Sequence, residues 1–252
     1  MIETPVVDEP VTVIFSKKGW VRARQGWEVD PASLSFKEGD GLMSLIKCRT
    51  VDPVIFLDSK GRAYTVDAAQ LPPARGDGVP ASSLVEIQDG AHIMYALTGK
   101  PEQKVLVATT GGYGFLSKIG DMVSNRRAGR EFMSVDEGHM PLEPFKYADA
   151  KGNYVATLSG GGRLLLFIID ELKYQPRGRG VNIMGLDEED KLFAAVIHNQ
   201  PDLIVKGKLR GDREKETRLK GDKLAHYFLK RARMGRVVSG VIISTALVVP
   251  ED

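Results

Sequence analysis

The feature that most constrains this chain is a pair of short apolar runs joined by a glycine turn. The clearest example runs from Tyr154 to Ile169, with the turn at Gly160–Gly162. Two apolar runs around glycine are typical of a β-hairpin, because glycine adopts the positive φ angles that such a turn needs. Similar pairs begin at Val11, Val54 and Val105, and a looser fifth copy runs from Leu203 to Arg236.

The turn glycines follow a regular spacing along the chain. They stand at positions 19, 61, 112 and 162, which are steps of 42, 51 and 50 residues. A period of about 40–50 residues with several strands in each repeat predicts an all-β, propeller-like fold. Five copies predict about five blades, although the loose fifth copy leaves room for a sixth blade or for a ring that does not close.

Composition bounds the class of protein. The 252 residues predict one β domain over 11–252, and the polar start with two prolines predicts a linker or tail over 1–10, as in a fragment of a longer polypeptide. The single cysteine, Cys48, excludes an internal disulfide and favours the cytoplasm. The apolar run 164–169 is too short for a membrane helix, and no signal peptide is evident, so no membrane partner is expected.

The sequence contains no residue pattern that is typical of a catalytic site or a metal site. The four histidines are far apart, without the spacing of metal ligands. No Ser/His/Asp or Cys/His arrangement is evident, and the glycines at 160–162 precede no Lys-Ser/Thr and open no helix, so they are not a nucleotide loop. We therefore expect no catalytic residue, metal site or cofactor in this chain.

The positive signal lies in the arginine-rich, glycine-containing loops that follow each hairpin. Net charge is only +2, yet Leu203–Arg236 holds twelve Lys/Arg against four Asp/Glu. The arginines fall at one phase of the repeat, and equal phase in a propeller predicts a common outer rim. Guanidinium forks bind phosphate through two hydrogen bonds, so the pattern favours a polyanion partner over a set of solvated turns. These arginines are Arg75, Arg126, Arg127, Arg130, Arg177, Arg179, Arg231, Arg233 and Arg236.

Several local expectations accompany this interpretation. Trp20 and Trp27 are expected in the core, because large aromatic side chains are mostly buried. Leu84–Ile87 is expected to form a strand, and Val237–Val249 two closing strands or one bent strand. Asp67 and Asp170 are expected to cap single helical turns.

Several motifs together resemble the C-terminal domain of the topoisomerase IV A subunit (ParC), over nearly the whole chain from about Pro10. They are Pro10–Val13 with Lys18–Arg22, Asp58–Arg62, Leu71–Gly76, Gly112–Phe115 and Asn125–Arg130. The related gyrase domain has an intact Gln-Arg-Arg-Gly-Gly-Lys-Gly box, whereas Gln175–Gly180 is only a degenerate likeness. This difference favours topoisomerase IV over a gyrase-type wrapping domain.

The resemblance implies a β-pinwheel that binds and bends double-stranded DNA on its outer rim without cutting it. It also implies two partners, the N-terminal catalytic region and the ATPase B subunit, with ATP and Mg²⁺ in the holoenzyme and a place with the nucleoid. A propeller used for protein–protein contact is the alternative. The predicted DNA-binding residues are Lys18, Arg22, Arg24, Lys60, Arg62, Arg75, Arg126, Arg127, Arg130, Arg163, Arg177, Arg179, Lys230, Arg231, Arg233 and Arg236.

Overall fold

The computed structural model describes residues 4–251 and contains five antiparallel sheets within them. The chain packs as two compact units. Unit 1 holds the chain up to Glu102 together with Ile119–Met133, and unit 2 holds Gln103–Lys118 and the chain from Ser134 on. The extent of a single domain over 11–252 therefore stays a prediction.

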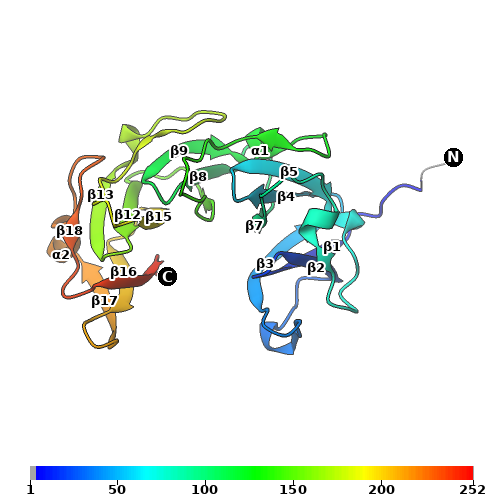
Figure 1. Ribbon diagram of the computed structural model, residues 1–252, viewed down its shortest axis with the longest axis horizontal. Coiled ribbons are helices and arrows are strands. Elements are labelled where there is room, and N and C mark those ends of the chain that lie inside the picture. The colour runs from blue at the N-terminus through cyan, green and yellow to red at the C-terminus, as the bar shows by residue number, and fades with distance from the viewer. Residues whose placement is uncertain (1–3, 252) are drawn as a thin grey trace. The chain divides into compact units, whose positions relative to one another are not determined.

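Each sheet is built on one hairpin, and the five hairpins are those that the sequence repeats (Figure 1). They are β1 (Pro10–Ser16) with β2 (Trp20–Gln25), β4 (Pro53–Asp58) with β5 (Arg62–Asp67), β8 (Lys104–Ala108) with β9 (Tyr113–Lys118), β12 (Tyr154–Ser159) with β13 (Arg163–Ile168), and β16 (Asp202–Lys208) with β17 (Glu214–Lys220). A later strand of the same repeat pairs with the first hairpin strand. These strands are β3 (Leu42–Arg49), β7 (Ile93–Leu97), β11 (Phe145–Tyr147), β15 (Leu192–His198) and β19 (Ile243–Val248).

The fourth strand of four sheets comes from the following repeat. It is a two-residue strand that pairs with the second strand of the preceding hairpin. The pairs are β6 (Val79–Pro80) with β2, β10 (Arg130–Glu131) with β5, β14 (Val181–Asn182) with β9, and β18 (Arg236–Val237) with β13. This exchange of strands between repeats confirms the predicted pinwheel form of the propeller.

The fifth sheet has three strands in the order β17-β16-β19. Within the described residues β17 pairs with β16 alone, so one edge of Glu214–Lys220 stays open. Charged side chains alternate along this strand, and charge on an open edge opposes pairing with other chains.

Short helical turns connect these strands, and they are η1 (Pro31–Ser33), η2 (Ala68–Gln70), η3 (Ala81–Ser83), η4 (Ile169–Glu171), α1 (Ile119–Met122) and α2 (Asp222–Ala225). The expected cap at Asp67 is confirmed, because it forms a capping box with Gln70. The expected cap at Asp170 is wrong: η4 begins at Ile169, one residue earlier, and Ile168 stands at the N-cap. None of the helices in the described chain is long and apolar enough to cross a lipid bilayer.

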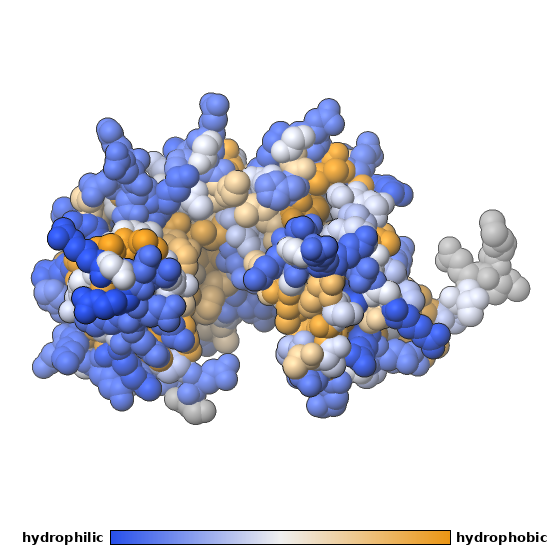
Figure 2. Space-filling model, turned by 60° about the horizontal axis from the view of Figure 1, so that its bottom comes forward, coloured by the Kyte–Doolittle hydropathy of each residue, from blue (hydrophilic) through white to orange (hydrophobic). Residues whose placement is uncertain are grey.

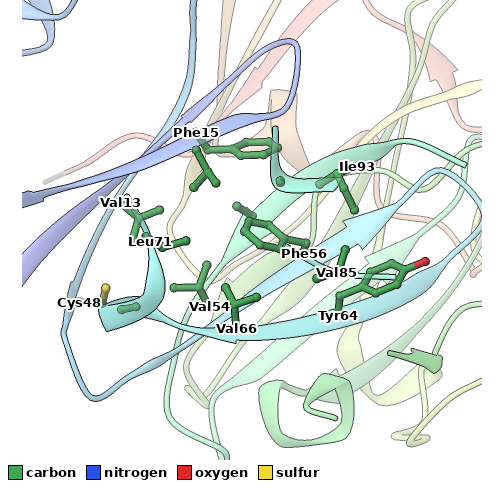
Figure 3. Packing of buried hydrophobic residues seen from close by; sticks show 14 of the residues in the cluster. Val13, Phe15, Cys48, Val54, Phe56, Tyr64, Val66, Leu71, Val85 and Ile93 are labelled. Atoms are coloured by element: carbon green, nitrogen blue, oxygen red, sulfur yellow. The ribbon is translucent and has the colours of Figure 1, made fainter. Parts of the chain in front are cut away.

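Each unit has its own apolar core between neighbouring sheets. In unit 1, Phe15 of β1 faces Phe56 of β4, with ring centroids 6.2 Å apart (Figure 3). In unit 2, β12 is buried along its whole length, and its side chains enter two clusters, one on each face. Side chains alternate between the two faces of a strand, so a strand buried on both faces reads as a continuous apolar run.

Two expectations about apolar residues are wrong. Leu84–Glu86 forms turns after η3, and Ile87 has no regular structure, so the expected strand is absent. Val85 still enters the core as a single buried side chain. Trp27 is 42% exposed and donates its indole N–H to the Cys48 carbonyl, and Trp20 is half-buried, so neither tryptophan is a core residue.

The apolar run at the end of the chain forms two strands in different sheets. Val237 belongs to β18, which crosses to β13, whereas Ile243–Val248 is β19 and pairs with β16. The linker or tail expected over 1–10 stays a prediction, and β1 begins at Pro10. Residues 7–9 contact the end of β3, where Asp8 pairs with Arg49 at 2.6 Å.

Candidate nucleic-acid interface

Four arginine-bearing loops, here called the basic loops, stand directly before the exchanged strands. They comprise residues 74–78, 125–129, 176–180 and 231–235, and they lead into β6, β10, β14 and β18. Backbone contacts tether the chain ahead of three loops as well, through the bridges Ala23–Pro73, Leu116–Tyr174 and Leu166–Phe228. The equal phase of these loops in the sequence is therefore an equal place in the sheet.

One glycine in each basic loop is required by the strand exchange. Gly78, Gly129, Gly180 and Gly235 have φ angles between 67° and 84°. A Cβ atom at these positions would lie 2.1–2.5 Å from a backbone carbonyl oxygen of the neighbouring hairpin strand. Only glycine fits so close an approach at positive φ. These glycines therefore serve the docking of each basic loop onto the neighbouring sheet.

Three arginines of the hairpin strands hold these loops in place. Arg22 of β2 donates to the Gly76 and Ser35 carbonyls at 2.6 and 2.5 Å. Arg62 of β5 donates to the Ala128 and Gly129 carbonyls, and Arg163 of β13 donates to that of Gly235 at 3.4 Å. Because their donors are engaged with loop carbonyls, these side chains position the basic loops.

In the third sheet the arginine belongs to the basic loop and its contact to the hairpin strand, the opposite of the first, second and fourth sheets. Tyr113 of β9 stands where the second and fourth sheets have Arg62 and Arg163. The arginine comes from the loop instead, since the Arg179 guanidinium lies 3.8 Å above the centre of the Tyr113 ring. Asp136 also contacts Arg179, and the hydrogen bond between them raises the pKa of the guanidinium.

Each basic loop also carries an exposed arginine that forms no hydrogen bond or ion pair through its side chain with any described residue. These arginines are Arg75, Arg126, Arg177 and Arg233, one in each loop. In the view of Figure 2, hydrophilic residues cover most of the protruding surface. The four guanidinium groups are therefore available to an anion from solution.

Part of the sequence matches the family described as DNA gyrase C-terminal domain, beta-propeller. The match covers residues 53–98, 103–139 and 153–199, which is half of the chain. The chain belongs to the DNA gyrase C-terminal domain family. Its membership confirms the β-propeller class and the resemblance predicted from the motifs.

Curated relatives of this chain are named as the A subunit of DNA topoisomerase 4. The protein from Neisseria gonorrhoeae is 38% identical over 92% of this chain, and that from Pseudomonas aeruginosa is 34% identical over 90%. The chain spans about 30% of the length of each relative. The solved structure of the E. coli ParC C-terminal domain has a TM-score of 0.83 at 30% identity and covers 95% of this chain and 98% of that one. A DNA gyrase A C-terminal domain, with a TM-score of 0.67 at 17% identity over 96% of this chain and 83% of that one, shares the fold.

The remaining residues that the sequence predicts as DNA ligands lie in varied surroundings. Arg127 reaches the Ser83 carbonyl at 3.4 Å, and Arg236 contacts the His226 ring. Arg130 and Arg231 are half-buried and donate to the Val123 and Asn182 carbonyls. Lys18, Lys60 and Lys230 are exposed; the first two stand in hairpin turns, and Lys60 donates to the Asp89 carbonyl.

Arg24 and Arg75 share a cavity of about 690 Å³ in unit 1, to which Arg22 also contributes. None of the described residues that line the cavity is acidic. An uncompensated positive charge in a concave surface attracts anions, so this cavity is a candidate phosphate site. It joins a strand residue and a loop residue that the sequence alone does not bring together.

The fifth hairpin turn carries two further cations that are not among the DNA ligands predicted from the sequence. Arg210 and Arg213 are exposed there and flank Gly211, which has a φ of 79°. The spacing of the turn glycines could have located this turn, since Gly211 follows Gly162 by 49 residues, one further step of the repeat. Lys37 was also missed; its ammonium lies 4.0 Å from the centre of the Trp20 ring.

Arg22 does not fit the role of a DNA ligand. Its side chain is buried, with a residue exposure of 5%, and its guanidinium lies 5.1 Å from the Phe36 ring centre in addition to its two carbonyl contacts. A guanidinium that is buried and bonded to two carbonyls presents little surface to a phosphate. We therefore leave Arg22 out of the proposed interface and assign it to loop positioning.

Arg22→Ala is expected to lower the free energy of unfolding by about 2–3 kcal/mol, because two carbonyls lose charge-assisted donors. Duplex affinity should change less than about twofold once the folded fraction is accounted for. Arg24→Ala is the matched control, since Arg24 is exposed two residues along the same strand. It should leave stability within about 0.5 kcal/mol and weaken duplex binding. Urea unfolding with a duplex titration checks both variants, and the reverse pattern would contradict the assignment.

Proposed function

We propose that this chain is a non-catalytic accessory domain of topoisomerase IV that binds and bends double-stranded DNA. The observation that carries the proposal is the recurrence of one unengaged, exposed arginine in each of the four basic loops. A chance set of solvated arginines would not repeat at one place in successive sheets. Membership in the gyrase C-terminal domain family supports the same conclusion.

The chemistry of the loops suits the phosphate backbone and not the bases. Arginine forks bind phosphate oxygens in two-point fashion, and backbone contacts of this kind carry little sequence information. Each unit has two basic loops, so two groups of phosphates on one duplex are engaged by each unit. We infer that the duplex curves to reach both loops. Bending a short site costs on the order of 1–6 kcal/mol, which several phosphate contacts offset.

In the complete topoisomerase, the domain steers a DNA segment towards the catalytic region and so influences which DNA topologies the enzyme prefers. This role implies two partners, the N-terminal catalytic region and the ATPase B subunit, with ATP and Mg²⁺ used there and no cofactor in this chain. It also implies a place on the bacterial nucleoid in the cytoplasm. Relatives named as the A subunit of topoisomerase IV support these proposals.

A salt titration tests the proposed function. Phosphate binding releases counterions, so the logarithm of the association constant should fall with the logarithm of salt concentration at a slope of about −0.9 for each contact. Four unengaged arginines predict a total slope of roughly −3 to −4. Gel shifts of the chain on a linear duplex from low to moderate salt measure it. A flat response, or no shift at any salt, would reject DNA binding and favour a protein–protein scaffold.

A further inference from the structure

Arg179 differs from the other arginines of the basic loops because a carboxylate occupies its guanidinium. Its Nε and Nη2 atoms lie 3.1 and 2.7 Å from the same Oδ2 atom of Asp136. In the described chain no other basic-loop arginine forms a side-chain ion pair. Both side chains are about half exposed, so the pair is open to competition from solution.

The backbone fixes Asp136 beside this loop. The Ser134 amide donates to the Gly178 carbonyl at 3.0 Å, which joins the acidic segment to the basic loop. Asp136 then opens a turn that closes where the His139 amide donates to the Asp136 carbonyl at 3.1 Å. The carboxylate therefore meets Arg179 through a defined turn and not through a mobile surface side chain.

The corresponding position is Gln88 in the second repeat and Asp187 in the fourth, and among the described residues neither forms an ion pair with a basic loop. The equivalent turn of the first repeat opens at Lys37, whose ammonium lies over Trp20 as Arg179 lies over Tyr113. In the first and fourth repeats the acidic residue that closes the turn caps the hairpin: Asp40 accepts from the Lys18 amide, and Asp190 from the Gly161 amide. In the third repeat His139 closes the turn, so Asp136, which opens it, is not the counterpart of these caps, and its carboxylate contacts Arg179.

We propose that Asp136 competes with DNA phosphate for Arg179 and thereby lowers the duplex affinity of loop 176–180. The proposal rests on the DNA-binding function proposed above. A phosphate that approaches this loop must displace the carboxylate or bind beside its negative charge. The cation–π contact with Tyr113 does not depend on Asp136, so an Arg179 released from the carboxylate stays beside the Tyr113 ring. Asp136 thus sets how strongly the third sheet holds DNA.

Asp136→Asn tests this assignment, because asparagine keeps the size and an acceptor while it removes the charge. We expect duplex affinity about three- to tenfold tighter in low salt, with a salt slope steeper by about 0.9, one added phosphate contact. Asp149→Asn is the matched control. Asp149 also pairs with a cation of unit 2, Lys104, and the change in net charge is identical. The control should change affinity less than twofold.

A double variant separates local competition from a general charge effect. In an Arg179→Ala background, Asp136→Asn should no longer tighten binding. An equal gain in that background, an equal gain from Asp149→Asn, or no gain from Asp136→Asn while the unmodified chain binds duplex would each overturn the inference. Absence of duplex binding by the unmodified chain would instead reject the proposed function itself.

Discussion

Gly180→Ala is expected to lower the free energy of unfolding by about 2–4 kcal/mol. The new Cβ would lie 2.1 Å from the Gly114 carbonyl oxygen and 2.5 Å from its carbon, both in the backbone of β9. Neither can move without parting β14 from β9, where Val181 pairs with Gly114. Overpacking costs about 1–3 kcal/mol, and a non-glycine residue at positive φ about 1 kcal/mol more. Denaturant unfolding of the chain measures the loss.

Gly138→Ala is the matched control for this prediction. Gly138 also lies in unit 2 and has the same φ of 80°, yet no atom outside its chain neighbours lies within 4 Å of an added Cβ. This variant should lose about 1 kcal/mol, the cost of the backbone conformation alone. Equal losses in the two variants would show that the contact between loop and neighbouring strand does not hold the exchanged strand.

The triple variant Arg126→Ala, Arg177→Ala and Arg233→Ala is expected to weaken duplex binding by about tenfold to a hundredfold at ~100 mM salt. Each substitution removes an exposed guanidinium that makes no side-chain contact with the described residues, so the melting temperature should stay nearly unchanged. The salt slope should become shallower by roughly 2.7, about 0.9 for each lost phosphate contact. Fluorescence anisotropy on a labelled duplex across a salt series measures both quantities.

A second triple variant controls for the loss of net charge. Lys100→Ala, Lys151→Ala and Lys191→Ala removes three exposed cations outside the basic loops, one from unit 1 and two from unit 2, as in the first variant. It should weaken binding by less than about threefold. Similar losses from both triples would mean that diffuse charge, and not the basic loops, carries the affinity.

Much of the fold was predictable because a hairpin is encoded locally. The turn at Asp58–Gly61 illustrates this: Gly61 supplies a φ of 89°, and Asp58 accepts the amides of Lys60 and Arg62. Such signals lie within a few residues of one another and recur with the repeat. Leu84–Ile87 has an apolar pattern of the same kind but forms no strand, because a strand also needs a partner strand, and residues 84–87 pair with none in the described chain.

The phase of the basic loops was predictable too, but the function of each arginine was not. Arg22 and Arg24 are two residues apart on β2. Arg22 is buried and donates to the Gly76 carbonyl of a basic loop, whereas Arg24 is exposed. Arg177 and Arg179 share one loop, yet Asp136 engages only the second. Residue type and spacing are the same in each pair, so the sequence holds nothing that separates them.

By itself the sequence determined the repeated hairpins, the β-propeller class and the place of the arginine loops within each repeat. These follow from turn geometry and apolar patterning, which act over a few neighbouring residues. Tertiary structure alone decided which guanidinium groups face solvent, why the loop glycines are required and where Asp136 lies. Those outcomes depend on partners 43–72 positions away along the chain, as for Arg22 with Gly76, Arg163 with Gly235 and Arg179 with Asp136, and such partners meet only when one repeat docks onto the next.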